Sequence, residues 1–418
     1  HSAATHMIPY GKQTIDADDI AAVVEVLKSD WLTTGPKVAE FEAAFAAFAG
    51  VRHAVTVANG TAALHAAMFA AGIGPGDEVI VTPMSFAASA NCIVYMGAIP
   101  VFADVDPGTL LIDPAAVQGK ITPKTKAIIG VDYAGLPCDW DALLAVADRH
   151  GLVLVDDACH AVGGSYKGRP VGSLAGLNTF SFHPVKNMTT GEGGMVTTDS
   201  DEFARRLRMF RSHGVTVDFR QRMESHSWFY EMVELGYNYR ITDFQCALGL
   251  SQLKKLPGWI ARRNEIAAMY DVAFGGRSAE SGIGHRKHTD HIERREHMSG
   301  DGRVAKTLST NTQQPTTIRP LTYPPYAHIH GRHLYVIRVP AERRAAIFAG
   351  LRKAGIGVNV HYIPIHLHPF YRERFGTGPG LCPVAEAAYD EIISLPMFPA
   401  MTDSEVEHVI RTVRNLGH

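Results

Sequence analysis

The sequence predicts an α/β protein with a large domain built on a mostly parallel sheet and a small α+β domain after it. Continuous apolar runs at 127–131 and 152–155 are typical of strands covered on both faces, and helix-length stretches separate them. This alternation favours a parallel sheet with right-handed crossovers. A chain of 418 residues also exceeds one simple core. We expect the large domain at 8–255 and the small one at 256–418.

Helices and strands alternate through the first hundred residues. A helix over 20–27 follows an acidic cluster at 16–19, which suits a helix N-terminus. The spacing of Phe41, Phe45 and Phe48 predicts a second helix that ends near Gly50. The elements predicted next are a strand at 55–58, a helix at 62–71, a strand at 78–82, a helix at 85–96 and a strand at 100–103.

The stretch 178–194 carries the clearest chemical signal. It begins as a buried strand, in which Phe180 and Phe182 alternate with polar residues, and it ends in a glycine-rich turn at 191–194. Lys186 lies between the two. Desolvation there would lower the pKa of the lysine and make its amine a nucleophile. The pattern indicates a Schiff-base lysine that holds pyridoxal phosphate (PLP); the alternative is a surface lysine that follows a strand.

A pair of carboxylates stands at the tip of another predicted strand. Asp156 and Asp157 follow the apolar run 152–155, where a carboxylate is costly unless a cation pairs with it. A protonated pyridine nitrogen is such a cation, and the pairing would strengthen the ring as an electron sink. The alternative is an aspartate that caps a helix. His160 could stack on or bond to a ring, or it could be an ordinary core histidine.

The sequence Asn59-Gly60-Thr61 connects a strand directly to a helix. This geometry aims free backbone N–H groups and the positive end of a helix dipole at an anion, although many such turns bind nothing. The turn falls at the carboxyl ends of the predicted strands, as do Phe86, Asp157, Ser181 and Lys186. Ligands of parallel sheets bind at that edge.

The second half of the chain is less regular. A strand at 195–198 and a helix at 200–211 precede a polar and mixed stretch at 212–234, which is predicted as a loop that could reach a partner subunit. Thr242 and Gln245 are spaced as a capping box. The stretch 275–317 predicts a polar loop rather than a metal site, although it contains His285, His288, His291 and His297. The remaining elements are predicted as a strand at 333–339, a helix at 341–354, a strand at 357–362 and a helix from 403.

Composition argues against several classes of function. A formal net charge of −2 and a pI of about 6.9 leave no basic excess for a nucleic acid. No apolar run approaches the roughly 18 residues of a membrane span, and no secretory segment is recognisable. The five cysteines are scattered and form no CxxC pair, which favours reduced thiols in a cytoplasmic protein and no metal centre.

Seven motifs, in family order, resemble those of the DegT/DnrJ/StrS-type sugar aminotransferases, and the resemblance runs from Ile8 through nearly the whole chain. It implies the PLP-dependent transferase fold type I, with a mixed, mostly parallel sheet in the large domain. The stretch 275–317 is longer and less apolar than is typical of this family. The motifs are Leu32-Thr-Thr-Gly35, Asn59-Gly-Thr-Ala62, Pro83-Met-Ser-Phe86, Asp157-Ala-Cys-His160, Phe180-Ser-Phe-His-Pro-Val-Lys186, Thr190-Gly-Glu-Gly-Gly194 and Gly236-Tyr-Asn-Tyr-Arg240.

The resemblance also implies roles for individual residues and a homodimer with shared active sites. Lys186 would be the catalytic residue that forms the Schiff base. The cofactor would be bound by Asp157 at the pyridine nitrogen, by Phe86 and His160 beside the ring, by Gly60, Thr61 and Ser181 at the phosphate, and by Asn238 of the neighbouring subunit. The sugar nucleotide would contact Tyr10, Asp30, Trp31, Leu32, Thr33, His183, His333, Leu334 and Tyr335, and Arg240 would receive the glutamate carboxylate.

The reaction implied by the resemblance moves the amino group of L-glutamate, which leaves as 2-oxoglutarate, to the C4 keto group of a nucleotide-linked 4-keto-6-deoxy sugar. The stretches 85–91, 131–135 and 210–214 are most similar to the UDP-4-amino-4,6-dideoxy-N-acetyl-β-L-altrosamine transaminases of pseudaminic acid biosynthesis. Their substrate is UDP-2-acetamido-2,6-dideoxy-β-L-arabino-hex-4-ulose.

Other functions remain open within this fold. One is an aminotransferase for another nucleotide-linked 4-keto or 3-keto sugar of lipopolysaccharide, glycan or antibiotic sugar synthesis. A PLP sugar dehydratase is disfavoured, because a histidine replaces the lysine in that branch. A non-catalytic sensor would need an added output module, which no segment supplies.

Overall fold

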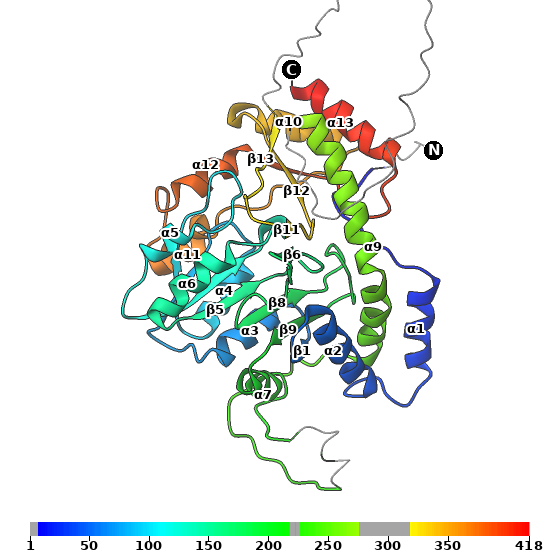
Figure 1. The fold of residues 1–418 in the computed structure, drawn as a ribbon, viewed down its shortest axis with the longest axis vertical. Helices are drawn as coiled ribbons and strands as arrows, with labels where there is room; N and C mark the ends of the chain where they lie inside the picture. Colours follow the sequence, from blue (N-terminus) through cyan, green and yellow to red (C-terminus); the bar gives the residue numbers. More distant parts are fainter. Residues whose placement is uncertain (1–6, 218–221, 223–225, 276–317, 418) are drawn as a thin grey trace, which may run out of the picture.

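A seven-stranded sheet forms the centre of the molecule (Figure 1). The computed structural model describes residues 7–217, 222, 226–275 and 318–417. β9 is antiparallel to both of its neighbours, and all other pairs in this sheet are parallel, which confirms the predicted mixed, mostly parallel sheet. The strands in spatial order are β1 (His53–Val57), β9 (Gly194–Thr198), β8 (Leu177–Ser181), β5 (Val153–Asp157), β4 (Thr125–Val131), β2 (Glu78–Val81) and β3 (Ile99–Phe102).

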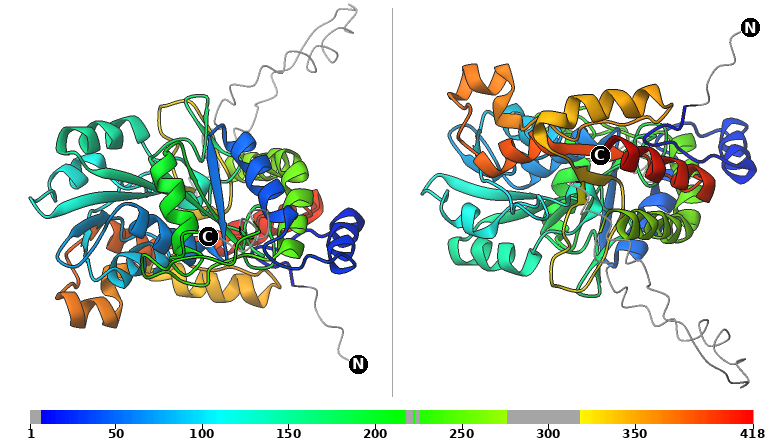
Figure 2. Two further views of the ribbon diagram at one scale, coloured as in Figure 1. Left: turned by 90° about the horizontal axis from the view of Figure 1, so that it is seen from below. Right: turned by 90° about the horizontal axis from the view of Figure 1, so that it is seen from above.

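Helices cover both faces of the sheet. α3 (Gly60–Ala70) lies against β8 and β9 and contacts both α4 (Ala88–Tyr95) and α7 (Asp201–Phe210). On the other face, α6 (Trp140–His150) packs on β4 and β5 beside α5 (Pro114–Gln118) (Figure 2). The helix predicted from position 85 begins at Ala88, so the preceding residues form a loop at the carboxyl end of β2.

One long helix connects the two predicted domains. α9 (Asp243–Phe274) begins with the predicted capping box between Thr242 and Gln245 and continues for 32 residues. The boundary predicted between 255 and 256 therefore lies within this helix. Its first half packs against α1 (Ala17–Leu27) and α2 (Pro36–Ala49), which confirms two further predicted helices.

A second hydrophobic core surrounds the C-terminal half of α9. Ile266, Tyr270 and Phe274 contribute to it from the helix, and Ile8 contributes from the start of the chain. It contains a small antiparallel sheet in the order β10 (Arg319–Pro320), β12 (Tyr335–Arg338) and β13 (Ile392–Leu395), with α10 (Ala341–Lys353) and α13 (Asp403–Gly417) beside it (Figure 2). The other elements are α11 (Pro369–Phe375), α12 (Pro383–Glu391) and a small sheet of β11 (His328–Ile329), β6 (Ser165–Tyr166) and β7 (Arg169–Pro170).

The strand predicted at 357–362 does not form. Asn359 makes a single bridge to Ser394, and the chain then leaves the small sheet. Its next residues line a cavity instead of continuing the ladder. His361 still bonds to Ser394 on β13, whereas Tyr362 bonds to His160 in the cavity wall. The predicted polar loop at 275–317 lies outside the described residues except for Gly275, which ends α9.

Two exposed features project from the large domain. α1 stands at the edge of the molecule (Figure 2), and Ile20 and Leu27 on it are 58% and 55% exposed. The second feature follows α7 and extends away from the sheet (Figure 1). Its exposed apolar residues, called the strap here, are Trp228, Phe229, Tyr230, Met232, Val233 and Leu235. In the described part of the chain, no helix combines the length and apolarity that crossing a membrane requires.

Candidate active site

A cavity of about 580 Å³ opens at the carboxyl ends of the central strands. Its volume is within the range of small-molecule sites, roughly 300–1,000 Å³. The sheet topology explains its position, because β5 and β8 are parallel neighbours and end side by side. The predicted site residues that line this cavity are Tyr10, Gly60, Thr61, Phe86, Asp157, His160, Ser181, His183, Lys186 and His333.

Lys186 lies in the turn that follows β8. Its backbone N–H donates to the carbonyl of His183 (2.9 Å), and Asn187 anchors the turn by donating to the carbonyls of Val162 (3.2 Å) and Gly331. Burial lowers the pKa of Lys186, and the nearby Cys159 and Asp157 oppose this shift. The predicted direction of the shift is therefore confirmed, and the amine is a better nucleophile than that of a solvated lysine.

Asp157 is the carboxylate that faces the cavity. It is the last residue of β5, is 4% exposed, and accepts hydrogen bonds from the Ser89 hydroxyl (2.6 Å) and the backbone N–H of Cys159 (3.3 Å). Asp156 precedes it and faces the opposite side of the sheet, because side chains alternate along a strand. The choice between these two aspartates, which the sequence alone leaves open, therefore favours Asp157.

Asp156 belongs to a buried acidic pair behind the cavity. Both of its carboxylate oxygens, and Oδ2 of Asp132, have no hydrogen-bond partner among the described residues. Burial raises the pKa of Asp156 well above its ordinary value, and Asp132 adds to the shift. Burial also raises the pKa of Asp132 to about 8, although its Oδ1 accepts bonds from the N–H of Cys138 and the indole of Trp140. Burial therefore favours the protonated, uncharged form of both carboxyl groups.

The start of α3 forms a cradle with the end of β8. Asn59 caps the helix by accepting from the N–H of Ala62 (2.8 Å), and the first N–H groups of a helix have no partner inside it. A Cβ atom on Gly60 would lie only 2.7 Å from Cβ of Ser181, so glycine is needed for this close approach. Gly60, Thr61 and Ser181 thus present N–H and hydroxyl donors to one end of the cavity, which fits a phosphate.

Imidazole and phenol groups form the wall near Lys186. His160 Nε2 lies 3.0 Å from the hydroxyl of Tyr362, and the rings of His160 and His333 are 4.5 Å apart. Burial lowers the pKa of both histidines well below the ordinary value, and Lys186 adds to both shifts. The wall is therefore uncharged near neutral pH. Tyr362 and His361 are site residues that the sequence did not reveal, because their segment was predicted as a strand.

Six of the predicted site residues lie away from the cavity. Asn238 is exposed and bridges Ser212, and Thr33 bridges Thr242 just after Arg240. The backbone N–H of Asp243 also donates to the carbonyl of Leu32 (2.9 Å). We call this set, which does not line the cavity of its own chain, the outer group; it consists of Asp30, Trp31, Leu32, Thr33, Asn238 and Arg240.

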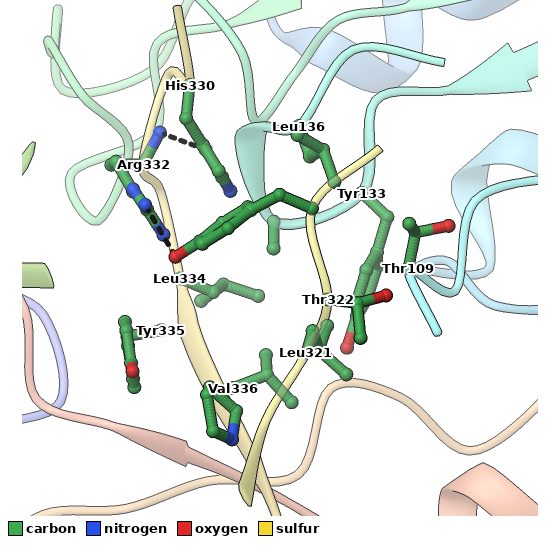
Figure 3. A pocket seen from close by; sticks show the side chains of 13 residues that line it. Thr109, Tyr133, Leu136, Leu321, Thr322, His330, Arg332, Leu334, Tyr335 and Val336 are labelled. Atoms are coloured by element: carbon green, nitrogen blue, oxygen red, sulfur yellow. Dashed lines mark hydrogen bonds between the residues drawn. The ribbon is translucent and has the colours of Figure 1, made fainter. Parts of the chain in front are cut away.

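Leu334 and Tyr335 lie around a separate, much smaller cavity of about 20 Å³ (Figure 3). The Tyr335 hydroxyl donates to Asp271 on α9 (2.7 Å), and the same carboxylate accepts a bond from Tyr323 (2.7 Å). Arg332, which Figure 3 shows beside this cavity, donates to the Tyr323 hydroxyl (2.7 Å). The structure thus brings His333 to the main cavity but does not bring the next two residues there.

Comparison with known families identifies the fold and the chemistry. The model of the DegT/DnrJ/EryC1/StrS aminotransferase family matches residues 13–299 and 290–414. The chain belongs to this family. It is also 41% identical over 420 residues to the spore coat polysaccharide biosynthesis protein SpsC of Bacillus subtilis, with 98% of this chain and 97% of SpsC covered.

Solved aminotransferase structures share the whole architecture. Spr1654 from Streptococcus pneumoniae, assigned as a sugar aminotransferase, has a TM-score of 0.84 at 33% identity in its PMP form, covering 98% of this chain and 99% of that one. Its PLP form gives the same TM-score. Helicobacter pylori PseC, an aminotransferase of pseudoaminic acid biosynthesis, has a TM-score of 0.83 at 31% identity, with 98% and 99% covered. The predicted fold type I and PLP dependence are confirmed: this protein is a PLP-dependent sugar aminotransferase.

Proposed function

We propose that the enzyme transfers the amino group of L-glutamate to the C4 keto group of a nucleotide-linked 4-keto-6-deoxy sugar. This proposal rests on one observation: Lys186, Asp157 and the cradle of Gly60, Thr61 and Ser181 all line the same cavity. Likeness to PseC supports UDP-2-acetamido-2,6-dideoxy-β-L-arabino-hex-4-ulose, a precursor of pseudaminic acid, as the first candidate substrate. Likeness to SpsC supports the alternative, another nucleotide-linked keto sugar of a surface polysaccharide.

The chain offers a partner to each end of the cofactor. The cradle of Gly60, Thr61 and Ser181 would hold the phosphate, and Asp157 would pair with the ring nitrogen. Phe86 would lie against the ring from the side of the β2 loop, since it lines the cavity and is 61% exposed. When bound, PLP would supply an electron-withdrawing ring that stabilises negative charge at the carbon next to the amino nitrogen joined to its aldehyde carbon.

Lys186 would carry out the proton transfers. Its Nζ, made less basic by burial, would take the proton from the α-carbon of glutamate and deliver a proton to the cofactor carbon that is bonded to the transferred nitrogen. In the second half of the cycle, the same amine delivers a proton to C4 of the sugar. His160 and His333 are uncharged near neutral pH, so they surround the amine without adding a second positive charge.

The open side of the cavity would receive the sugar nucleotide. Tyr10, His183 and His333 line it with groups that can bond hydroxyls or phosphate. The pKa of Tyr10 is raised by burial, so its phenol stays protonated and can donate. Leu334 and Tyr335, predicted to contact the sugar nucleotide, do not line this cavity.

We also propose a homodimer in which each active site uses both chains. Asn238 and Arg240 do not line their own cavity, and the exposed apolar strap precedes them. Contiguous exposed apolar residues mark interaction surfaces. Asn238 of one subunit would reach the cofactor phosphate of the other, with Arg240 placed to meet the glutamate carboxylate.

The five free cysteines support a cytoplasmic location.

The reaction is tested by a screen. Purified enzyme with PLP and glutamate should form 2-oxoglutarate in step with a 4-amino sugar when given the UDP substrate named above. Nucleotide-linked 3-keto sugars and other 4-keto sugars are the comparison set. If the enzyme turns over only a different keto sugar, the result favours the alternative substrate. Glutamate consumption without any sugar acceptor would contradict the proposal.

The shared site is tested by mixing two inactive variants. Lys186→Ala subunits combined with Asn238→Ala subunits should regain part of the activity, because one site of the mixed dimer carries both changes and the other carries neither. A sample that contains only Lys186→Ala subunits is the control. A monomer by light scattering, or proven mixed dimers without activity, would contradict the shared site.

A further inference from the structure

The two carboxylate oxygens of Asp157 have unequal surroundings. Oδ2 accepts a short bond of 2.6 Å from the Ser89 hydroxyl, whereas Oδ1 receives the N–H of Cys159 at 3.3 Å. Ser89 lies on α4 and is 1% exposed. It bonds to Asp157 of β5, which is 68 positions later in the sequence. One oxygen is therefore held by a strong donor within the protein, and the other keeps the capacity to accept a bond from the cavity.

A second hydroxyl supports the first. Ser85 Oγ lies 2.7 Å from Ser89 Oγ, and both serines are buried in the cavity wall. A hydroxyl has one proton, and Ser89 donates its own to Asp157. The proton between the two serines must then come from Ser85. The hydrogen bonds run in one direction, from Ser85 through Ser89 to the carboxylate.

This arrangement differs from the usual behaviour of serine in a helix. Helical serines commonly bond a carbonyl of the preceding turn, which satisfies the hydroxyl locally. Ser89 instead uses its proton on a carboxylate of a neighbouring strand, and so it fixes the carboxylate rather than the helix. The loop before α4 places Ser85 at the right distance, since the helix begins only at Ala88.

We propose that Ser89 is a positioning residue for Asp157 and that Ser85 orients the Ser89 hydroxyl. The inference rests on the proposed pairing of Asp157 with the ring nitrogen of PLP. Holding Oδ2 stops rotation of the carboxylate and presents Oδ1 to the cavity. Neither serine was among the residues that the sequence indicated, although Ser85 and Ser89 are four positions apart in one motif-bearing stretch.

The test compares Ser89→Ala with Ser89→Thr, which keeps a hydroxyl, and with Ser251→Ala, a buried serine on α9 that does not line the cavity. Two readouts do not require turnover: the dissociation constant of PLP for the apoenzyme, and the pH midpoint of the visible absorbance band of the reconstituted enzyme. Ser89→Ala should bind PLP about tenfold more weakly. Its midpoint should move to higher pH, because a ring nitrogen that is less firmly protonated repels a neighbouring proton less. Ser89→Thr should recover most of both values.

A double-mutant cycle with Asp157→Asn assigns the effect to the carboxylate. If Ser89 acts through Asp157, Ser89→Ala should change neither readout further in the Asp157→Asn background. Equal effects in both backgrounds, or values for Ser89→Ala that match Ser251→Ala, would overturn the inference. If Asp157→Asn itself leaves both readouts at wild-type values, the proposed pairing fails instead. Should Ser89→Ala not fold, Ser85→Ala carries the same test, with a shift in the same direction of about two- to threefold in affinity.

Discussion

Replacement of Gly60 by alanine tests the proposed phosphate cradle. A Cβ atom at this position would lie 2.7 Å from Cβ and 3.1 Å from Oγ of Ser181, whereas ordinary contacts begin at 3.4 Å. Either the start of α3 or the end of β8 must therefore move by several tenths of an ångström. Because Gly60, Thr61 and Ser181 line the same end of the cavity, this movement separates the groups that would hold the phosphate.

Stability and cofactor affinity should respond to different degrees. Overpacking costs about 1–3 kcal/mol, and the change from glycine to alanine offsets about 0.4–1 kcal/mol of this through the unfolded chain. The free energy of unfolding of the Gly60→Ala apoenzyme should therefore fall by about 2.6 kcal/mol or less. Weakening one hydrogen bond to a charged group is worth about 1.5–3 kcal/mol, so the Kd for PLP should rise by roughly 10- to 150-fold.

Urea unfolding of the apoenzyme and its titration with PLP measure the two quantities separately. Gly74→Ala is the matched control, because a Cβ at that glycine would meet nothing within 4 Å. We expect the control to match the wild type in PLP affinity. The reasoning about the cradle is refuted if Gly60→Ala binds PLP as tightly as Gly74→Ala does.

Three further predictions follow from the site. Lys186→Ala should abolish turnover and the visible absorbance band, and borohydride treatment of the wild type should label Lys186; a variant that turns over normally would exclude it as the catalytic lysine. Asp157→Asn should lower kcat by about tenfold or more with an unchanged circular dichroism spectrum, whereas near-normal activity would reduce Asp157 to a structural role. The pKa of Asp132 is about 8 in the folded state, whereas an ordinary aspartate has a pKa of about 3.9. Between these two pH values the folded state binds more protons than the unfolded state. The contribution of the pair of Asp132 and Asp156 to the free energy of unfolding therefore falls as pH rises through this window. Asp156→Asn should flatten that decline in urea midpoints between pH 5 and pH 8, and an unchanged slope would contradict the sign.

The central part of the site could be predicted because parallel strands end at one edge. Asp157 is the last residue of β5 and Lys186 follows β8, and these strands are neighbours in the sheet although 29 positions separate the two residues in the sequence. Apolar runs located those strands, and the rule for parallel sheets then placed their ends together. The strand–turn–helix connection at Asn59 was predicted from the local sequence, and the structure adds that Asn59 caps α3.

The small domain was less predictable because its strands are short and its loops enter the cavity. The alternation at 357–362 indicated a strand, but tertiary bonds of His361 and Tyr362 outweigh that preference. Tyr335 lies on β12 and faces the second core, whereas His333 precedes the strand and is free to turn toward Lys186. No spacing rule in the sequence distinguishes these two outcomes.

Helix α9 explains why the outer group remains away from the cavity of its own chain. The carboxylate of Asp243 at the start of the helix accepts from the N–H groups of Gly35 (2.7 Å) and Lys37 (2.9 Å), which fixes the turn that contains Trp31 and Leu32. In its second half, Arg263 donates to the carbonyls of Arg332 (3.2 Å) and Met397 (2.8 Å). One continuous helix thus sets the distance between the outer group and the second core. Closing the site within a single chain would require these bonds to break, whereas a second subunit could supply the missing residues with the bonds intact.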